Sequence, residues 1–522
     1  MRITLLALAA LVGGCHWNLN DPGTDPIPTQ LYFPSAIAMD PGGRYAYIAN
    51  GNADLKYGGG TVMVADMLVF ECTIARYRQL HPAGPLDVAP PMSPSCGDPA
   101  SFDPIIEGAK CRPDPIDPTI VDCDEKAFVL PNATVRVGNF ASGIRIHRID
   151  KTKRRLFVVV RGDPSITEID VDLGGDLTMP GVLNCFNDVR SLTQRKGYDA
   201  VNNVTIAPPP CDATWLVQEY TCDNKPTCTT GKDGMGLTQL ASEPFGMELD
   251  VANNRLLVSH LATGQVSLVD INVTANKALK SISDPFFPPD TLGRHGGFAL
   301  AQKDPGDPSS LWYLTSSVNP QIASFRVGRA DVIIPSFAFG LSASFAQGTD
   351  VRAISFEPGG QRAFVTENNP PSLLTIDTSA RTDGGGGTPN NIVRDIVDVC
   401  QTPSHMGVRR INRPGAPGTP TQRSTRIVVV CFLSSQLMVV DPDRPGVNDT
   451  IFSGFGGPND LDFNFLDDGA VAAPEALPAR PRMGFVTNYT ESTVSMVDFE
   501  PGSVSENRVI ARLGFPPDGF QP

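Results

Sequence analysis

The stretch GFVTNYTESTVSMVD (484–498) decides the fold, because it contains a complete strand–turn–strand unit. An apolar run ends at Asn488, a polar turn follows, and a second alternating run ends at Asp498. Alternation of apolar and polar residues over four to eight positions is typical of a half-buried β-strand. One such unit predicts a β-hairpin, and its recurrence along the chain predicts a repeat architecture.

The unit recurs, and we take these two strands as the second and third of each repeat. The second strands are AYIAN (46–50), FVVVR (157–161), LLVSH (256–260), WYLTS (312–316), AFVTE (363–367), IVVVC (427–431) and GFVTN (484–488). The third strands are TVMVAD (61–66), SITEID (165–170), QVSLVD (265–270), QIASFR (321–326), SLLTID (372–377), QLMVVD (436–441) and TVSMVD (493–498). All but one of the third strands end in Asp. We expect this Asp to accept backbone N–H bonds in the turn that follows.

A first strand precedes each pair, and a fourth strand is visible in three repeats. The first strands are SAIAMD (35–40), GIRIHR (143–148), FGMELD (245–250), GGFALA (296–301), RAISFE (352–357), MGVRRI (406–411) and DLDFNF (460–465). The fourth strands are TVRVGNF (134–140), NIVRDIV (391–397) and NRVIARLGF (507–515). Four short antiparallel strands in each of seven radial repeats predict an all-β fold, a seven-bladed β-propeller.

These units resemble the YVTN family of propeller repeats, in which PDGxxxYVxN and VxVID recur. The resemblance covers residues 33–515 apart from two insertions, and it implies architecture more than activity. The predicted organisation is a signal peptide at 1–14, a lipidated Cys and tether at 15–31, a propeller at 32–515 and a C-terminal tail at 516–522. How the ring closes is left open by the sequence.

Two long insertions interrupt the repeat, at 67–133 in blade 1 and 173–240 in blade 2. Both follow strand three of their blade, so we expect them to leave the disc on the same face. Loops of this length inside a compact domain are uncommon and often functional. The insertions are therefore the first candidates for a partner surface.

Ten of the 11 cysteines remain when Cys15 is set aside, an even number that predicts disulfides in an exported protein. The candidates are Cys72, Cys96, Cys111 and Cys123 in the first insertion, Cys185, Cys211, Cys222 and Cys228 in the second, and Cys400 and Cys431 in blade 6. Three pairings are possible within each set of four. Five residues separate Cys222 from Cys228 and the second insertion has no His, so we predict no metal site there.

The N-terminus reads MRITLLALAALVGGC. One Arg followed by a short apolar run is typical of a signal peptide. The small residues before Cys15 resemble the lipobox of bacterial lipoproteins, with Val12 where that family usually has Leu, and the resemblance implies a lipid on Cys15. His16 follows where the family's inner-membrane retention signal is Asp, which favours the outer membrane. An ordinary secretory signal with an incidental Cys is the alternative.

The composition excludes two classes of function. The 522-residue chain has a formal net charge of −14 and no basic stripe, which argues against a nucleic-acid partner. It has no run of about 18 apolar residues of the kind that spans a membrane. The motifs HExxH, GxSxG, GxxxxGK[ST] and CxxCH are absent. We therefore predict no catalytic residues, no cofactor and no covalent haem.

One aligned column of the first strands is charged, and first strands line the channel of a propeller. It reads Ala38, Arg145, Glu248, Ala299, Ser355, Arg409 and Asp462. Arg145 and Glu248 fall in neighbouring blades, as do Arg409 and Asp462, so we predict two ion pairs between blades. Their role is either to fix the registry of the blades or to form an anion- or carbohydrate-binding channel mouth.

The column at the end of the second strands is polar and mixed, and we expect it to form a solvated rim. It reads Asn50, Arg161, His260, Ser316, Glu367, Cys431 and Asn488. These observations favour a lipid-anchored, non-catalytic binding or scaffold protein of the cell envelope, with a protein or glycan partner on the two insertions. The alternative is a lactonase-like or quinoprotein-like enzyme with its site in the channel.

Overall fold

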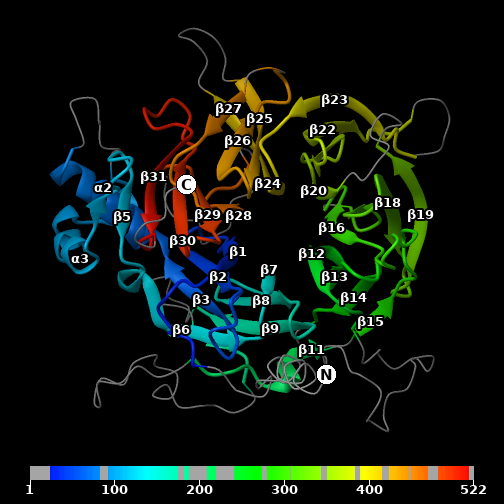
Figure 1. The fold of residues 1–522 in the computed structure, drawn as a ribbon, viewed down its shortest axis with the longest axis horizontal. Coiled ribbons are helices and arrows are strands. Elements are labelled where there is room, and N and C mark those ends of the chain that lie inside the picture. Colours follow the sequence, from blue (N-terminus) through cyan, green and yellow to red (C-terminus); the bar gives the residue numbers. More distant parts are fainter. Residues whose placement is uncertain are drawn as a thin grey trace, which may run out of the picture.

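The computed structural model describes residues 24–82, 92–173, 182–186, 208–218, 240–272, 279–305, 307–341, 350–381, 388–413, 422–444, 446, 448–467 and 480–516. Within these ranges the chain forms seven antiparallel sheets that stand side by side around a central channel (Figure 1). The predicted seven-bladed β-propeller is confirmed. Cys15, Cys222 and Cys228 lie outside the described residues, as do the predicted signal peptide, most of the tether and most of the second insertion.

Each blade runs from an innermost first strand to an outermost fourth strand. Blades 1 to 3 are β1 (Pro34–Met39), β2 (Tyr45–Asn50), β3 (Gly60–Asp66) and β6 (Val129–Val137); β7 (Ala141–Arg148), β8 (Lys153–Val160), β9 (Ser165–Asp172) and β10 (Val182–Asn184); and β12 (Pro244–Asp250), β13 (Arg255–His260), β14 (Val266–Asp270) and β15 (Leu279–Ile282). Blades 4 and 5 are β16 (Gly297–Gln302), β17 (Trp312–Ser316), β18 (Gln321–Val327) and β19 (Ile333–Gly340); and β20 (Val351–Phe356), β21 (Arg362–Asn368), β22 (Pro371–Asp377) and β23 (Ile392–Asp398).

Blades 6 and 7 are β24 (Pro403–Arg413), β25 (Gln422–Cys431), β26 (Gln436–Val440) and β27 (Asn448–Ile451); and β28 (Pro458–Phe463), β29 (Met483–Asn488), β30 (Thr493–Asp498) and β31 (Arg508–Leu513). The second strands are buried on both faces, because each blade packs against a blade on either side. The turns between strands two and three, and the connections from strand four to the next blade, open on what we call the lower face. The opposite side is the upper face.

Most of the Asp residues predicted to end third strands accept backbone N–H bonds in the next turn, but Asp170 lies inside β9 and pairs with Arg155. Asp377 accepts from Ser379 N at 3.0 Å, and Asp498 accepts from Glu500 N at 2.8 Å. Asp66 caps helix α2 (Met67–Leu80) by accepting from Val69 N at 3.1 Å. These carboxylates stabilise turns and the start of a helix, and they do not form a catalytic group.

The first insertion folds into a lobe outside the ring, beside β31 and β6 (Figure 1). It contains α2, α3 (Asp103–Gly108), the short 3-10 helices Pro94–Cys96, Pro99–Phe102 and Glu125–Ala127, and the strands β4 (Arg112–Pro113) and β5 (Val121–Cys123). Disulfides join Cys72 to Cys96 and Cys111 to Cys123. We expected the lobe to project from the upper face. Instead it lies at the outer edge of the ring, because its strands extend the sheet of blade 7.

The first insertion covers the seam between the first and last blades. β5 pairs in parallel with β31 of blade 7, and β4 extends this sheet. Side chains of α2, β5, blade 1 and blade 7 form one apolar cluster, with Phe70, Phe128 and Phe485 fully buried in it. Each blade is complete in its own stretch of chain, so the ring closes by this added strand and not by exchange of a blade strand.

The second insertion also forms backbone hydrogen bonds with strands of the ring. Its described part forms β10, the 3-10 helix Ala213–Trp215 and β11 (Leu216–Gln218), and both strands pair with β9 of blade 2. Residues 209–211 then reach back to blade 1, where Arg136 N donates to Pro209 O at 2.9 Å in a parallel bridge with Pro210. Each insertion therefore adds a parallel strand or bridge to the outer strand of the preceding blade.

The disulfide prediction is confirmed where the structure describes the cysteines. Cys185 pairs with Cys211 within the second insertion, and Cys400 pairs with Cys431 in blade 6. The described bridges thus stay within the three predicted groups of cysteines. Three of them hold the inserted segments, and the fourth lies within the repeat.

Candidate functional site: the central channel

The channel is lined by the first strands, and each of these begins with a register shift against its second strand. Such β-bulges bend a strand and change the direction of its side chains. The channel-facing edge of a first strand has no neighbouring strand, so its backbone groups need other partners. The charged residues of the channel supply several of them.

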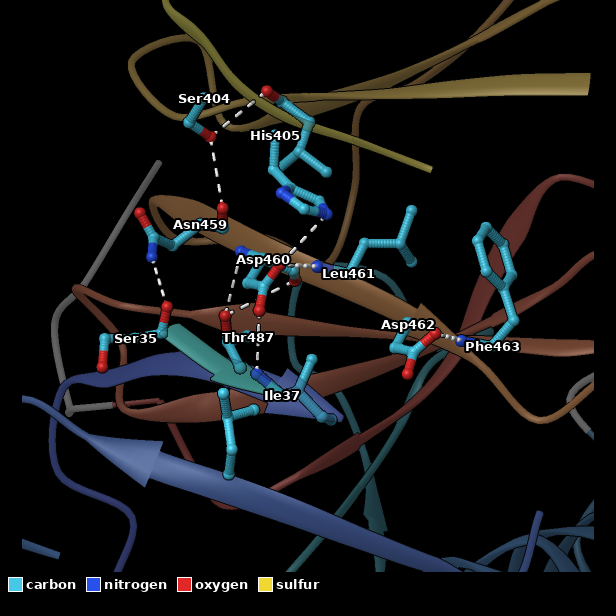
Figure 2. Close-up of polar contacts among 12 residues, drawn as sticks. Ser35, Ile37, Ser404, His405, Asn459, Asp460, Leu461, Asp462, Phe463 and Thr487 are labelled. Carbon is cyan, nitrogen blue, oxygen red and sulfur yellow. Dashed lines mark hydrogen bonds and ion pairs between the residues drawn. The ribbon is translucent and has the colours of Figure 1, made fainter. Parts of the chain in front are cut away.

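Three side chains of β28 bond the backbone of β1 across the seam between blades 7 and 1, and Figure 2 shows the bonds of Asn459 and Asp460. Asn459 donates from Nδ2 to Ser35 O at 2.5 Å. Asp460 accepts from Ile37 N at 2.9 Å, and Asp462 accepts from Met39 N at 2.8 Å. Together these side chains satisfy backbone groups along the inner edge of β1, where no strand is paired.

The second oxygens of these two aspartates are also occupied. Asp460 Oδ1 accepts from Leu461 N at 3.0 Å and lies 3.2 Å from His405 Nε2 (Figure 2). Asp462 Oδ1 accepts from Phe463 N at 2.8 Å and lies 3.3 Å from Arg409 Nη2. Both carboxylates therefore bond the protein through both oxygens.

The residues predicted to pair across blades lie within ion-pair distance. Arg145 Nε lies 3.4 Å from Glu248 Oε2, and Arg409 Nη2 lies 3.3 Å from Asp462 Oδ1. The Arg145 and Glu248 side chains are 36% and 34% exposed. At such exposure a pair contributes at most about 1 kcal/mol, because water screens the charges. These pairs therefore serve to fix the relative positions of neighbouring blades more than to add to the free energy of folding.

Burial and charge oppose each other at the two ends of this cluster. Burial acts to lower the pKa of Arg145, but the carboxylates of Glu248, Asp460 and Asp462 outweigh it and raise that pKa. Burial raises the pKa of Asp462, and the Arg409 guanidinium with two backbone N–H groups opposes the rise. The charges of blades 2, 3, 6 and 7 therefore form one electrostatic cluster.

The arginines and Glu248 also serve their own strands. Arg145 Nη1 donates to Ile144 O at 3.0 Å, and Arg409 Nη1 donates to Val408 O at 2.9 Å. Glu248 Oε1 accepts from Leu249 N at 3.2 Å. Each charged side chain thus bonds the backbone of the strand that carries it.

The predicted channel column is out of register in two blades. Ala38 pairs with Tyr47, three residues before the end of β2, and the matching partner in blade 4 is Ala301, not Ala299. In blade 6 it is Gly407, which pairs with Val428, so Arg409 lies two residues further along β24. The bulge of β16 and the length of β24, 11 residues, shift an alignment made on apolar positions.

The predicted solvated rim at the ends of the second strands is wrong. Asn50, His260, Ser316, Glu367, Cys431 and Asn488 are buried, and the equivalent residue in blade 2 is Val160, one before Arg161. The residue after each second strand bonds the residue before its first strand, as in the bond from Leu261 N to Glu243 O at 2.9 Å. This bond closes the lower end of the blade over the column.

Buried members of this column find partners inside their own blades. Asn50 Nδ2 donates to Thr61 Oγ1 at 2.8 Å, and His260 Nε2 lies 2.7 Å from Ser267 Oγ. Burial lowers the pKa of His260 to about 4, against the opposing effect of its bond to the Ser242 carbonyl. His260 is therefore neutral at pH 7.

Sequence reasoning missed a row of aromatic side chains at the lower mouth. Phe432, Tyr489, Phe33 and Tyr32 follow one another with ring centroids 6.1, 5.2 and 5.0 Å apart. They lie just outside the strands, at positions that the strand alignment left out. A signal was present, since the residue after strand two is aromatic in blades 6 and 7.

The described residues contain no group of three or more His, Cys, Asp or Glu placed to hold a metal ion. Nor does this part of the chain include a helix that could cross a bilayer.

No protein-family model matches the chain, and no curated protein matches it. Solved structures with a similar fold include a putative 6-phosphogluconolactonase from Bacteroides uniformis, with 9% identity over 80% of this chain and 83% of that chain and a TM-score of 0.44. A periplasmic gluconolactonase from Pseudomonas aeruginosa has 13% identity over 80% and 83%, with a TM-score of 0.42. We draw nothing about activity from likenesses at this level.

Proposed function

We propose that the protein is a non-catalytic binding or scaffold protein of the cell envelope, anchored to the outer membrane by a lipid on Cys15. One observation carries the non-catalytic part: both oxygens of Asp460 and of Asp462 bond the ring itself. A general acid or base needs an oxygen within hydrogen-bond reach of its substrate. Here these carboxylates close the seam between blades 7 and 1.

The partner surface that we propose is the lobe of the first insertion, with a protein or glycan as its partner. The lobe is held to blade 7 by Arg512, which contacts Asp114 and lies 2.8 Å from Asp122 Oδ1. On the other side, Arg480 of blade 7 contacts the buried Glu71 of α2. A surface fixed in this way loses little conformational entropy when it binds, which favours affinity.

The experiment places a photoreactive residue on the lobe of the intact lipoprotein in its native envelope. Ile116 is 66% exposed on the lobe, and Val251, at 57%, is a control of similar exposure on the upper face of blade 3. We expect a defined crosslinked product from position 116 and none from 251. Equal labelling at both positions would contradict the assignment of the surface.

Two further measurements test the remaining parts. Mass spectrometry of the N-terminal peptide should show a diacylglyceryl group on Cys15, and the Cys15→Ser chain should lack it. The enzyme alternative predicts lactone hydrolysis that Glu248→Gln abolishes while the melting temperature stays unchanged. We expect no such activity, and its detection would replace the binding proposal with a channel enzyme.

A further inference from the structure

The lower face carries exposed, large apolar side chains on the turns of several blades. They are Leu55, Phe140, Leu292, Leu433 and Phe452. The described upper-face turns carry Val251, Val332, Leu466 and Val504, with no aromatic residue among these exposed apolar side chains. Single exposed apolar residues are ordinary, but large ones gathered on one face mark an interaction surface.

The aromatic row described above belongs to this same face. Phe432 and Tyr489 follow second strands, and Tyr32 and Phe33 precede the first strand of blade 1. Lys56 lies over the ring of Tyr32, 5.4 Å from its centroid. Rings that combine an apolar body with a polar edge are enriched where a membrane meets water.

The chain enters the ring on this face. Thr24 forms a bridge with Tyr57, and Thr24 O accepts from Gly58 N at 3.1 Å, both in the turn between β2 and β3. Thr24 is nine residues after Cys15. Nine residues span at most about 30 Å when fully extended. A lipid on Cys15 therefore holds the bilayer within that distance of the lower edge of blade 1.

The same tether makes the opposite orientation costly. Most blade strands have five to eight residues, which makes the disc about 20 Å thick before its turns are added. To place the upper face on lipid, the tether would have to extend around the rim of blade 1 for most of its reach. The lower face needs no such extension.

Three arginines of the described lower face are each paired with a carboxylate. Arg294 Nη2 lies 2.8 Å from Asp290 Oδ2, Arg352 contacts Asp350, and Arg161 lies 3.9 Å from Glu243. Among the described residues of this face, these pairs leave no cluster of unpaired arginines that would select anionic lipid. Apolar and aromatic contact with neutral or zwitterionic headgroups is the chemistry that fits.

We infer that the lower face lies on the surface of the bilayer, with Leu55, Phe140, Leu292, Leu433 and Phe452 at the boundary between headgroups and acyl chains. This inference rests on the proposed lipid anchor at Cys15. It gives the disc one orientation, in which the first-insertion lobe projects from the rim and the upper face points away from the lipid.

The test uses tryptophan probes and brominated zwitterionic lipids that quench tryptophan. Leu433→Trp and Leu292→Trp report on the lower face, at positions 67% and 75% exposed. Val251→Trp and Val504→Trp, 57% and 64% exposed, are matched controls on the upper face. Each lipidated full-length chain carries Trp17→Phe, which removes the native tryptophan beside the lipid. The chains are reconstituted on vesicles, and the emission is compared with that on unbrominated vesicles.

We expect loss of emission at both lower-face probes, no change at the controls, and the same result when anionic lipid is added. Quenching that is equal on the two faces, or absent from both, overturns the docking. A second sample carries Cys15→Ser and a histidine tag in place of the lipid, on nickel-chelating vesicles. Quenching at the lower-face probes of this second sample supports the docked face independently of the lipid. If the natural chain does not bind vesicles in a flotation assay, that result refutes the lipid anchor alone.

Discussion

Replacement of the buried Glu367 by Gln should stabilise the protein at alkaline pH and leave it unchanged at acidic pH. Glu367 is the last residue but one of β21 and has 0% exposure, and its Oε2 accepts from Ser372 Oγ at 3.3 Å. Its other oxygen is buried without a hydrogen-bond partner. Burial raises the pKa of this carboxyl to about 7, and the Ser372 bond opposes the rise.

The magnitude follows from the difference between the folded and unfolded pKa. The folded pKa of about 7 is about 2.5 pH units above the ordinary value of 4.5. At 1.36 kcal/mol per unit this corresponds to about 3 kcal/mol. Because the folded carboxyl binds its proton more tightly, stability is fully present below about pH 4.5, falls as the pH rises, and has lost this amount above about pH 7.

The assay is urea unfolding of the Glu367→Gln variant and its parent at pH 4.5 and pH 8.5, followed by tryptophan fluorescence. Gln has the same shape and no charge, so the two proteins should agree at pH 4.5. At pH 8.5 the variant should be more stable by up to about 3 kcal/mol. Glu107→Gln, at an exposed position on α3, is the control and should show no difference at either pH. A difference of equal size at both pH values would refute the reasoning.

Three other variants test the closure of the ring and its outer edges. Arg512→Met leaves a buried carboxylate cluster without its cation, so it should cost about 3–5 kcal/mol at pH 7 in urea unfolding, and less at pH 4; an equal loss at both pH values would exclude a charge effect. Cys111→Ser with Cys123→Ser opens the loop that ends in β5 and should cost about 2–4 kcal/mol; hydrogen exchange should then increase in β31, and unchanged exchange there would contradict a role of the disulfide in holding β5 against β31. Pro335→Val adds an N–H to β19, whose outer edge pairs with no described strand, so light scattering should show more self-association; a variant as monomeric as its parent would contradict this.

The repeat made the architecture predictable because it depends on local pattern. Alternating runs, tight turns and the recurring Asp are properties of a few neighbouring residues, and seven copies leave one radial arrangement. The pairing of Arg145 with Glu248 followed from the same alignment, since both lie on first strands of adjacent blades. Arg409 fell out of register because β24 is longer than its counterparts, which apolar spacing alone does not reveal.

The closure of the ring was not predictable in the same way. β5 is three residues long, and its partner on β31 lies about 390 residues later in the chain. No local pattern announces a parallel pairing over that separation. The burial of Glu367 could not be predicted from the sequence either. It depends on the backbone bond from Asn368 N to Asp350 O, which closes the lower end of the blade over this side chain.

The parallel strand that the first insertion adds to blade 7 sets an order of events during synthesis. The lobe is made early, and the disulfide between Cys111 and Cys123 lies wholly within it. β5 therefore waits with an unpaired edge while six blades are made, and β31 arrives last. A chain cut short before its final strand keeps that edge open to other molecules. Completion of the C-terminus removes the edge, so full-length protein and truncated protein differ in their tendency to associate.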